Sequence, residues 1–234
     1  MNQKNEFGQE IGYPLGDWQV PAFPEARVLE GQYVRLEPLT IRHAHDLFEA
    51  YSQDDGSMWT YMGSGPFPTL EGFKNWVETM TGGADPQFYA LIDKASAKAL
   101  GVASYLRIDP KAGSIEVGHI AYSPRLQKTR AATEAMYLLM KNVFEMGYRR
   151  YEWKCDALNQ KSRHAAARLG FIFEGIFRQA IHYKGRNRDT AWFAVIDKDW
   201  PSLEKSFQTW LNPDNFDSQG EQKSSLSSLT RGER

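Results

Sequence analysis

The chain lacks the many cysteines, the long apolar runs and the excess of positive charge that are features of disulfide-rich, membrane-spanning and nucleic-acid-binding proteins, respectively. One of its 234 residues is a cysteine, Cys155, so an internal disulfide is impossible and a reducing compartment is indicated. No apolar run approaches the roughly 20 residues that a transmembrane helix needs, and residues 1–18 lack the apolar core of a signal peptide. The formal net charge of −1 gives no reason to expect a nucleic-acid or membrane partner. We therefore expect a cytoplasmic protein.

What the sequence does contain is typical of one globular domain with extensions. Hydrophobic residues make up 41% and charged residues 24%, and 234 residues suit a single core better than two. Residues 1–30 are rich in glycine and proline and predict an irregular arm, which Trp18 and Phe23 would attach to the body. We expect the domain over residues 31–211. Serine, glutamine and charge dominate residues 212–234, which predicts a disordered tail.

Hydrophobic periodicity and turn residues predict a mixed α/β chain without internal repeats. The expected order is a strand, two helices, three antiparallel strands, a helix, a strand, a helix, two strands and a last helix. These elements fall at residues 32–39, 43–52, 69–80, 87–93, 99–108, 114–122, 131–146, 149–155, 159–169, 171–183, 189–196 and 199–211. The two late strand–helix–strand units require parallel pairing around the fourth and fifth strands.

The stretch over residues 114–135 is the centre of the functional argument. A strand over residues 114–122 passes through Ser123 and Pro124 into the helix that begins at the run AATEA. A polar loop that feeds a helix leaves backbone N–H groups without partners at the helix N-terminus, and such groups bind phosphate.

Three ordered motifs are similar to those of a known family. In the first, residues 127–135 (QKTRAATEA) lie where the family shows Q/R-x-x-G-x-G/A, often followed by A-T-E-A. In the second, N-x-x-S at residues 159–162 precedes L-G-F and E-G at residues 169–175. The third is R-D-x-x-x-F at residues 188–193. Together they resemble the GNAT (Gcn5-related) N-acetyltransferases, in particular the RimJ/RimL-like branch. The resemblance implies an α/β (α+β) fold with a mixed, mostly antiparallel, twisted sheet of about seven strands, flanked by helices and splayed between strands 4 and 5.

The resemblance also implies an activity. A GNAT enzyme transfers the acetyl group of acetyl-CoA to a primary amine, here a protein N-terminus or a small-molecule amine, by direct attack with general-base assistance. Lys128 and Arg130 stand where the loop glycines are usual, so the alternative is a degenerate domain that binds CoA, or nothing, as an interaction module. We expect a monomer or homodimer and no metal, since the rings of His43 and His45 diverge on a helix.

Two residues of the 114–122 strand are candidates for the base. Glu116 occupies the position of the catalytic glutamate in histone-acetylating relatives, and a regular strand would place it on one face with Gly118, Ile120 and Tyr122. A bulge would turn His119 toward the cleft instead. The alternative role for Glu116 is that of a solvent-facing or salt-bridged strand residue.

The later helix supplies candidates for the acid and for cofactor contact. Many GNAT proteins place a general-acid tyrosine where this chain has Ala166; in the branch that it resembles, Asn159 and Ser162 occupy that pocket. Asn159 could bond pantetheine amides, and Ser162 could bond the sulfur or a water, although both residue types also cap helices.

The expected binding residues follow from the same resemblance. The predicted cofactor-binding residues are Ile120, Ala121, Tyr122, Gln127, Lys128, Thr129, Arg130, Ala131, Ala132, Thr133, Asn159 and Ser162. The first three would pair with pantetheine as an added strand, and the loop residues would surround the diphosphate through backbone N–H groups. For the amine acceptor, we expect Trp59, Tyr61 and Tyr183 to line the site. Packing alone is the alternative for these aromatic residues.

Overall fold

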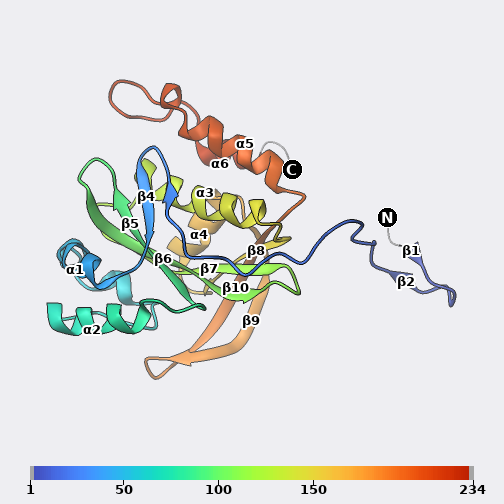
Figure 1. Ribbon diagram of the computed structural model, residues 1–234, viewed down its shortest axis with the longest axis horizontal. Coiled ribbons are helices and arrows are strands. Elements are labelled where there is room, and N and C mark those ends of the chain that lie inside the picture. Colours follow the sequence, from blue (N-terminus) through green and yellow to red (C-terminus); the bar gives the residue numbers. More distant parts are fainter. Residues whose placement is uncertain (1–2, 232–234) are drawn as a thin grey trace.

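The structure, a computed structural model, describes residues 3–231 and contains a mixed sheet of eight strands in the order β3-β4-β5-β6-β7-β8-β10-β9 (Figure 1). The strands are β3 (Leu29–Glu30), β4 (Val34–Pro38), β5 (Gln87–Asp93), β6 (Lys98–Asp109), β7 (Ser114–Tyr122), β8 (Arg150–Asp156), β9 (Ile172–Tyr183) and β10 (Arg186–Ile196). Every pair is antiparallel except β7–β8, which is parallel. The predicted mixed sheet is confirmed, with the short β3 added at one edge.

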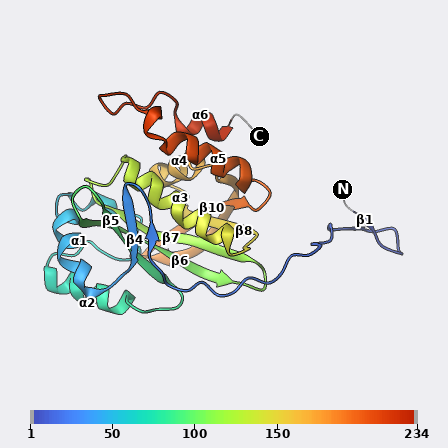
Figure 2. The ribbon, with the colours of Figure 1, turned by 45° about the horizontal axis from the view of Figure 1, so that its top comes forward.

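Helices cover both faces of this sheet (Figures 1 and 2). They are α1 (Ala44–Tyr51), α2 (Leu70–Met80), α3 (Arg130–Glu145), α4 (Gln160–Arg168), α5 (Trp200–Leu211) and α6 (Leu226–Arg231). One hydrophobic core lies between the sheet and α3, α4 and α5, and a second lies between the opposite face and α1 and α2. Within residues 3–231, no helix combines the length and apolarity that crossing a bilayer requires.

The parallel pair β7–β8 separates part of the way along. Its register runs from Ser114↔Arg150 to Val117↔Trp153, although β7 continues to Tyr122 and β8 to Asp156. Beyond Val117, the edge of β7 that faces β8 therefore has no strand partner. The splay expected between the fourth and fifth predicted strands is confirmed.

A bulge interrupts β7 at the same place. Ala121 pairs with Val102 and Gly118 with Ser104, so two residues of β7 lie opposite one residue of β6. One of them, His119, has a φ of 49°, in the left-handed region. Bulges reverse the alternation of side chains along a strand, so the faces predicted for a regular strand do not hold beyond Gly118.

Over its described residues, 3–30, the N-terminal arm contains the short pair β1 (Gln3–Lys4) and β2 (Glu10–Ile11), and β3 then joins the main sheet. Trp18 attaches the arm by donating from Nε1 to the carbonyl of Gly147 (2.9 Å). Phe23 does not, since it is 43% exposed; the neighbouring Pro24 is buried instead, and its carbonyl accepts from Gln87 Nε2 (2.6 Å).

The C-terminal segment is ordered over residues 213–231, so the prediction of disorder is wrong there; residues 232–234 lie outside the described residues. A 3-10 turn (Pro213–Asn215) leads to an antiparallel bridge between Phe216 and Gln222, and α6 follows. Leu226 is 0% exposed and belongs to the core under α3, α4 and α5. A few well-spaced apolar side chains thus anchor a segment whose average composition is polar.

Candidate active site

The loop between β7 and α3 forms a tight turn with the shape that glycine would favour. The N–H groups of Leu126 and Gln127 both donate to the carbonyl of Ser123 (3.0 Å each), and Thr129 caps α3 by accepting from the N–H of Ala132 through Oγ1 (3.1 Å). Lys128 has a φ of 61°. A lysine therefore adopts a left-handed conformation that L-residues rarely enter.

This turn presents hydrogen-bond donors without acceptors. The backbone N–H groups of Lys128, Arg130 and Ala131 donate to no acceptor within residues 3–231. They lie at the N-terminus of a 16-residue helix, where the helix dipole favours negative charge. Gln127 has an internal role, since its Nε2 donates to the carbonyl of Tyr122 (2.8 Å). The loop has the properties of an anion-binding site.

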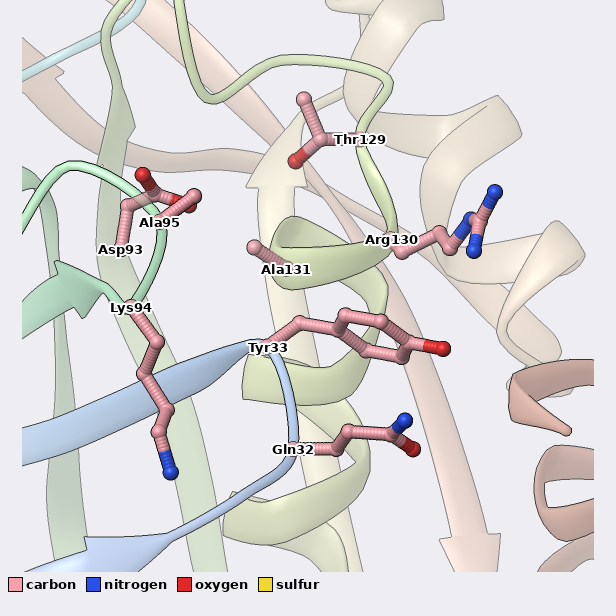
Figure 3. A pocket seen from close by; sticks show the side chains of 8 residues that line it. All are labelled: Gln32, Tyr33, Asp93, Lys94, Ala95, Thr129, Arg130 and Ala131. Carbon is pink, nitrogen blue, oxygen red and sulfur yellow. The ribbon is translucent and has the colours of Figure 1, made fainter. Parts of the chain in front are cut away.

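A pocket of about 520 Å³ opens beside the first turn of α3. It is lined by Gln32, Tyr33, Asp93, Lys94, Ala95, Thr129, Arg130 and Ala131. The side chains of Arg130 and Tyr33 extend in one direction, away from Asp93 and Lys94 (Figure 3). The pocket residues that lie outside the loop and α3 were not predicted, because nothing in their local sequence places them beside this helix. They are Gln32, Tyr33, Asp93, Lys94 and Ala95.

A long-range contact brings the β3–β4 turn to this pocket. Glu134, on the second turn of α3, accepts hydrogen bonds from the N–H groups of Gln32 (2.8 Å), Tyr33 (2.6 Å) and Val34 (2.9 Å). Three backbone donors on one buried carboxylate hold the turn against the helix. The glutamate of the A-T-E-A motif thus has a structural role in this chain.

Glu116 lies in a buried ion-pair network. It is 3% exposed, and its carboxylate contacts the Nη1 atom of Arg107 (2.8 Å) and the Nζ atom of Lys154 (2.8 Å). Lys154 also pairs with Glu152 (2.7 Å). Burial raises the pKa of Glu116, and the charges of Lys154 and Arg107 oppose that rise. The contacts correspond to the salt-bridged alternative, while a raised pKa is also what a general base near neutral pH requires.

The bulge is the alternative that the structure contains, so Glu116 does not share the face that a regular strand would give it. Ile120 and Tyr122 pack against the core under α3, together with Ile115, whereas Ala121 packs on the side of α1 and α2. Glu116 alternates with Ile115 and therefore does not share a face with Ile120 and Tyr122. The carbonyl of Ala121 accepts from the hydroxyl of Tyr51 (3.0 Å), which holds β7 from the α1 side.

His119 occupies the bulge itself. Its Nδ1 lies 2.8 Å from Oγ of Ser104, and its ring centroid lies 4.9 Å from that of Phe88, so one side of the imidazole is packed against the protein. Burial, and then the charge of Arg107, lower the pKa of His119 below 6.5. The imidazole is therefore neutral near pH 7 and able to accept a proton.

The start of α4 contains the two remaining polar candidates. Asn159 is the N-cap residue, and its Oδ1 accepts from the N–H of Ser162 (3.1 Å). Oγ of Ser162 accepts from Nε1 of Trp153 (3.0 Å). The capping role is therefore present, and the Ser162 hydroxyl also interacts with the Cys155 thiol, while the Nδ2 group of Asn159 has no acceptor within the described chain. Both side chains follow the end of β8, where β7 and β8 have separated.

The three residues expected at the acceptor side divide into two groups. Tyr61 and Tyr183 meet the end of β8: the Tyr61 hydroxyl donates to the carbonyl of Leu158 (3.4 Å), and the Tyr183 hydroxyl donates to Oδ2 of Asp156 (2.9 Å). Burial and the neighbouring Asp156 raise the pKa of Tyr183 to about 12. Trp59 is 4% exposed and packs in the α1–α2 core. Asp156 was not predicted, since its carboxylate gains this role only through the β9–β10 hairpin.

The sheet that separates between two parallel strands, together with the anion-binding turn after the first of them, defines an acetyltransferase fold of the GNAT type. Residues 34–172, more than half of the chain, match the acetyltransferase (GNAT) domain. The chain therefore belongs to the GNAT acetyltransferase family.

Solved structures agree with this assignment. A GCN5-related N-acetyltransferase from Brucella melitensis is 47% identical, with a TM-score of 0.90 over 92% of this chain and 99% of that one. A GNAT-family protein from Chromobacterium violaceum is 40% identical, with a TM-score of 0.76 over 82% and 96%. RimL, a ribosomal L7/L12 α-N-protein acetyltransferase, shares the fold at 20% identity, with a TM-score of 0.63 over 73% and 94%. No curated protein sequence matches the chain.

Proposed function

We propose that the protein is a cytoplasmic, acetyl-CoA-dependent N-acetyltransferase that acts on a primary amine, either a protein N-terminus or a small molecule. One observation carries this proposal: the edge of β7 left unpaired by the splay leads directly into a turn with three unsatisfied N–H groups. An amide-containing chain adds to an open strand edge, and a diphosphate binds a helix N-terminus. The two features occur in the order in which pantetheine and diphosphate follow each other in CoA.

The residues present fit that group. The backbone of residues 120–122 would hold the amide-containing arm, and the N–H groups of Lys128, Arg130 and Ala131 would hold the phosphates. The Nδ2 group of Asn159 is a further donor on the opposite side of the splay. Bound acetyl-CoA would supply the acetyl group as a reactive thioester.

The chain must then move two protons. An amine that attacks a carbonyl carbon has to lose a proton, and Glu116 and His119 are the two groups on β7 able to receive it. As the C–N bond forms and the C–S bond breaks, the sulfur that leaves gains a proton. Ser162 is our candidate for this donor, since Nε1 of Trp153 orients its oxygen and a hydroxyl can donate its own hydrogen.

For the acceptor, we propose the region at the end of β8, where Tyr183 contacts Asp156 and Tyr61 contacts the carbonyl of Leu158. Asp156 is 5% exposed and supplies a negative charge beside the hydroxyl of Tyr183. Such a group favours a cationic ammonium, which is the form of a primary amine before it loses its proton. RimL acts on a protein, as its name states, and that likeness of fold is the reason to include protein N-termini among the acceptors tested.

The test is calorimetric titration with acetyl-CoA, followed by measurement of CoA release across a panel of amines and peptide N-termini. We expect binding, and CoA release with at least one acceptor class. Binding without release across a broad panel would favour the alternative, a CoA-binding interaction module, which Lys128 and Arg130 in place of loop glycines suggest. Absence of binding would refute the proposal.

A further inference from the structure

Two arginines beside the phosphate-binding loop have no carboxylate partner. Arg130 is the first residue of α3, and Arg168, the last residue of α4, donates from Nη1 to Oγ1 of Thr133 (3.2 Å). Thr133 follows Arg130 by three residues, so the side chain of Arg130 and the site where Arg168 contacts the helix lie on one face of α3. Among residues 3–231, no carboxylate lies within 4.0 Å of either guanidinium.

Both guanidinium groups instead lie over aromatic rings, one in the C-terminal segment and one in α5. Arg130 lies 3.8 Å from the ring centroid of Phe216, and Arg168 lies 5.0 Å from that of Trp210. The two rings pack edge to face with their centroids 5.2 Å apart. Nε1 of Trp210 donates to Oε1 of Gln222 (2.8 Å), which ties α5 to the hairpin that carries Phe216.

This arrangement fixes positive charge without neutralising it. Cation–π contacts hold a guanidinium in place and leave its N–H edge available. Removing a cation from water without an anionic partner is unfavourable, and burial alone lowers the pKa of Arg168. The planar N–H fork of arginine matches a phosphate group in bidentate geometry. The missing counter-charge is therefore best supplied by a phosphate.

We propose that two aromatic side chains, Phe216 of the C-terminal hairpin (residues 212–222) and Trp210 of α5, belong to the cofactor site: they hold Arg130 and Arg168, respectively, where the arginines bind a phosphate group of acetyl-CoA. This inference rests on the proposed function. Phe216 and Trp210 are positioning residues, since they act through the arginines. A segment that its composition predicts to be disordered thus contributes to cofactor affinity.

The experiment measures CoA binding by calorimetry to the full-length protein and its variants. Phe216→Ala should raise the Kd for CoA about 10-fold, equivalent to about 1.4 kcal/mol, and Phe216→Tyr should restore it because the ring is kept. Ser218→Ala, in the same hairpin and without a side-chain partner in the described chain, is the matched control and should bind as the wild type does. In kinetics, KM for acetyl-CoA should rise in Phe216→Ala while kcat at saturation stays constant.

A second variant distinguishes a lost phosphate contact from a loss of binding that is caused by unfolding of the hairpin. Arg168→Gln leaves the hairpin intact and should also weaken CoA binding, whereas S-acetylpantetheine, which lacks the phosphates, should react equally well with the variants and the wild type. Retention of the Arg168→Gln effect with 3′-dephospho-CoA would assign the contact to the diphosphate, and its loss to the 3′-phosphate. Unchanged Kd values in both variants, or equal losses with S-acetylpantetheine, would overturn the inference while leaving the proposed function in place. A wild type that does not bind CoA would refute both.

Discussion

At the scale of single residues, Lys128 adopts a left-handed backbone conformation in a loop where glycine is usual. A non-glycine residue in the left-handed region costs about 1–2 kcal/mol, and Lys128 has a φ of 61°. We expect Lys128→Gly to be about 1 kcal/mol more stable than Lys128→Ala in urea denaturation, because both variants lose the charge and only glycine relieves the backbone. Equal free energies of unfolding would show that the loop does not impose this conformation.

A pH profile bears on the choice of base. The pKa of Glu116 is raised and that of His119 is lowered, so the two values shift toward each other, and either group would lose base activity as the pH falls. The acid limb of the wild type therefore cannot assign the base, and variants are needed. We expect Glu116→Gln to lower kcat by about 10²-fold or more and to flatten the acid limb of kcat/KM, with the Kd for acetyl-CoA unchanged.

The control for this variant is Glu152→Gln. Glu152 is the other carboxylate on Lys154, so this change disturbs the same lysine without altering the candidate base. It should keep the acid limb. Unchanged turnover in Glu116→Gln would remove Glu116 from the mechanism. If the acid limb of kcat/KM disappears only in His119→Gln, then His119 is the base.

At the scale of elements, Glu134 joins α3 to the β3–β4 turn and so shapes the pocket beside the loop. Hydrogen bonds to a charged group contribute about 1.5–3 kcal/mol each and are not additive. We expect Glu134→Ala to lower the free energy of unfolding by about 3 kcal/mol, since it leaves the N–H groups of Gln32, Tyr33 and Val34 without their acceptor.

Glu145→Ala is the matched control on the same helix. Its carboxylate is exposed and makes only a 3.7 Å pair with Lys141, which is worth about 0.5 kcal/mol at most. Gly31→Ala is an independent probe, because an added Cβ would overlap the carboxylate of Glu134. Stability losses of the same size for Glu134→Ala and Glu145→Ala would contradict the structural role of Glu134.

Elements whose signals are local were predictable from the sequence. Thr69 was expected to open a helix, and its side chain accepts from the N–H of Gly72. Another helix was expected to end at residue 146, and the glycine that follows it, Gly147, has a φ of 90°. The bulge at His119 could be raised only as an alternative, because it depends on how β7 pairs with β6. The contacts of Glu134 and Asp156 join residues far apart in sequence, and no local pattern encodes them.

At the scale of the whole molecule, the sheet separates two cores, and the C-terminal segment completes one of them. Composition predicted disorder after residue 211 because it averages over side chains, whereas burial depends on where each apolar side chain lies. Phe216, Leu226 and Leu229 all join the core under α3, α4 and α5. The segment that positions Arg130 is therefore anchored by hydrophobic contacts at both of its ends.

This anchoring yields the last prediction. Leu226 is 0% exposed, so Leu226→Ala should lower the free energy of unfolding by about 2–5 kcal/mol through lost burial and the cavity that remains. Leu158→Ala is the matched control: the same change at a leucine that is 73% exposed should fall within about 0.5 kcal/mol of the wild type. Chemical denaturation measures both. Because α6 follows directly on the hairpin that holds Arg130, Leu226→Ala should also weaken CoA binding, and equal stability of the two variants would instead mean that the C-terminal segment is not docked in solution.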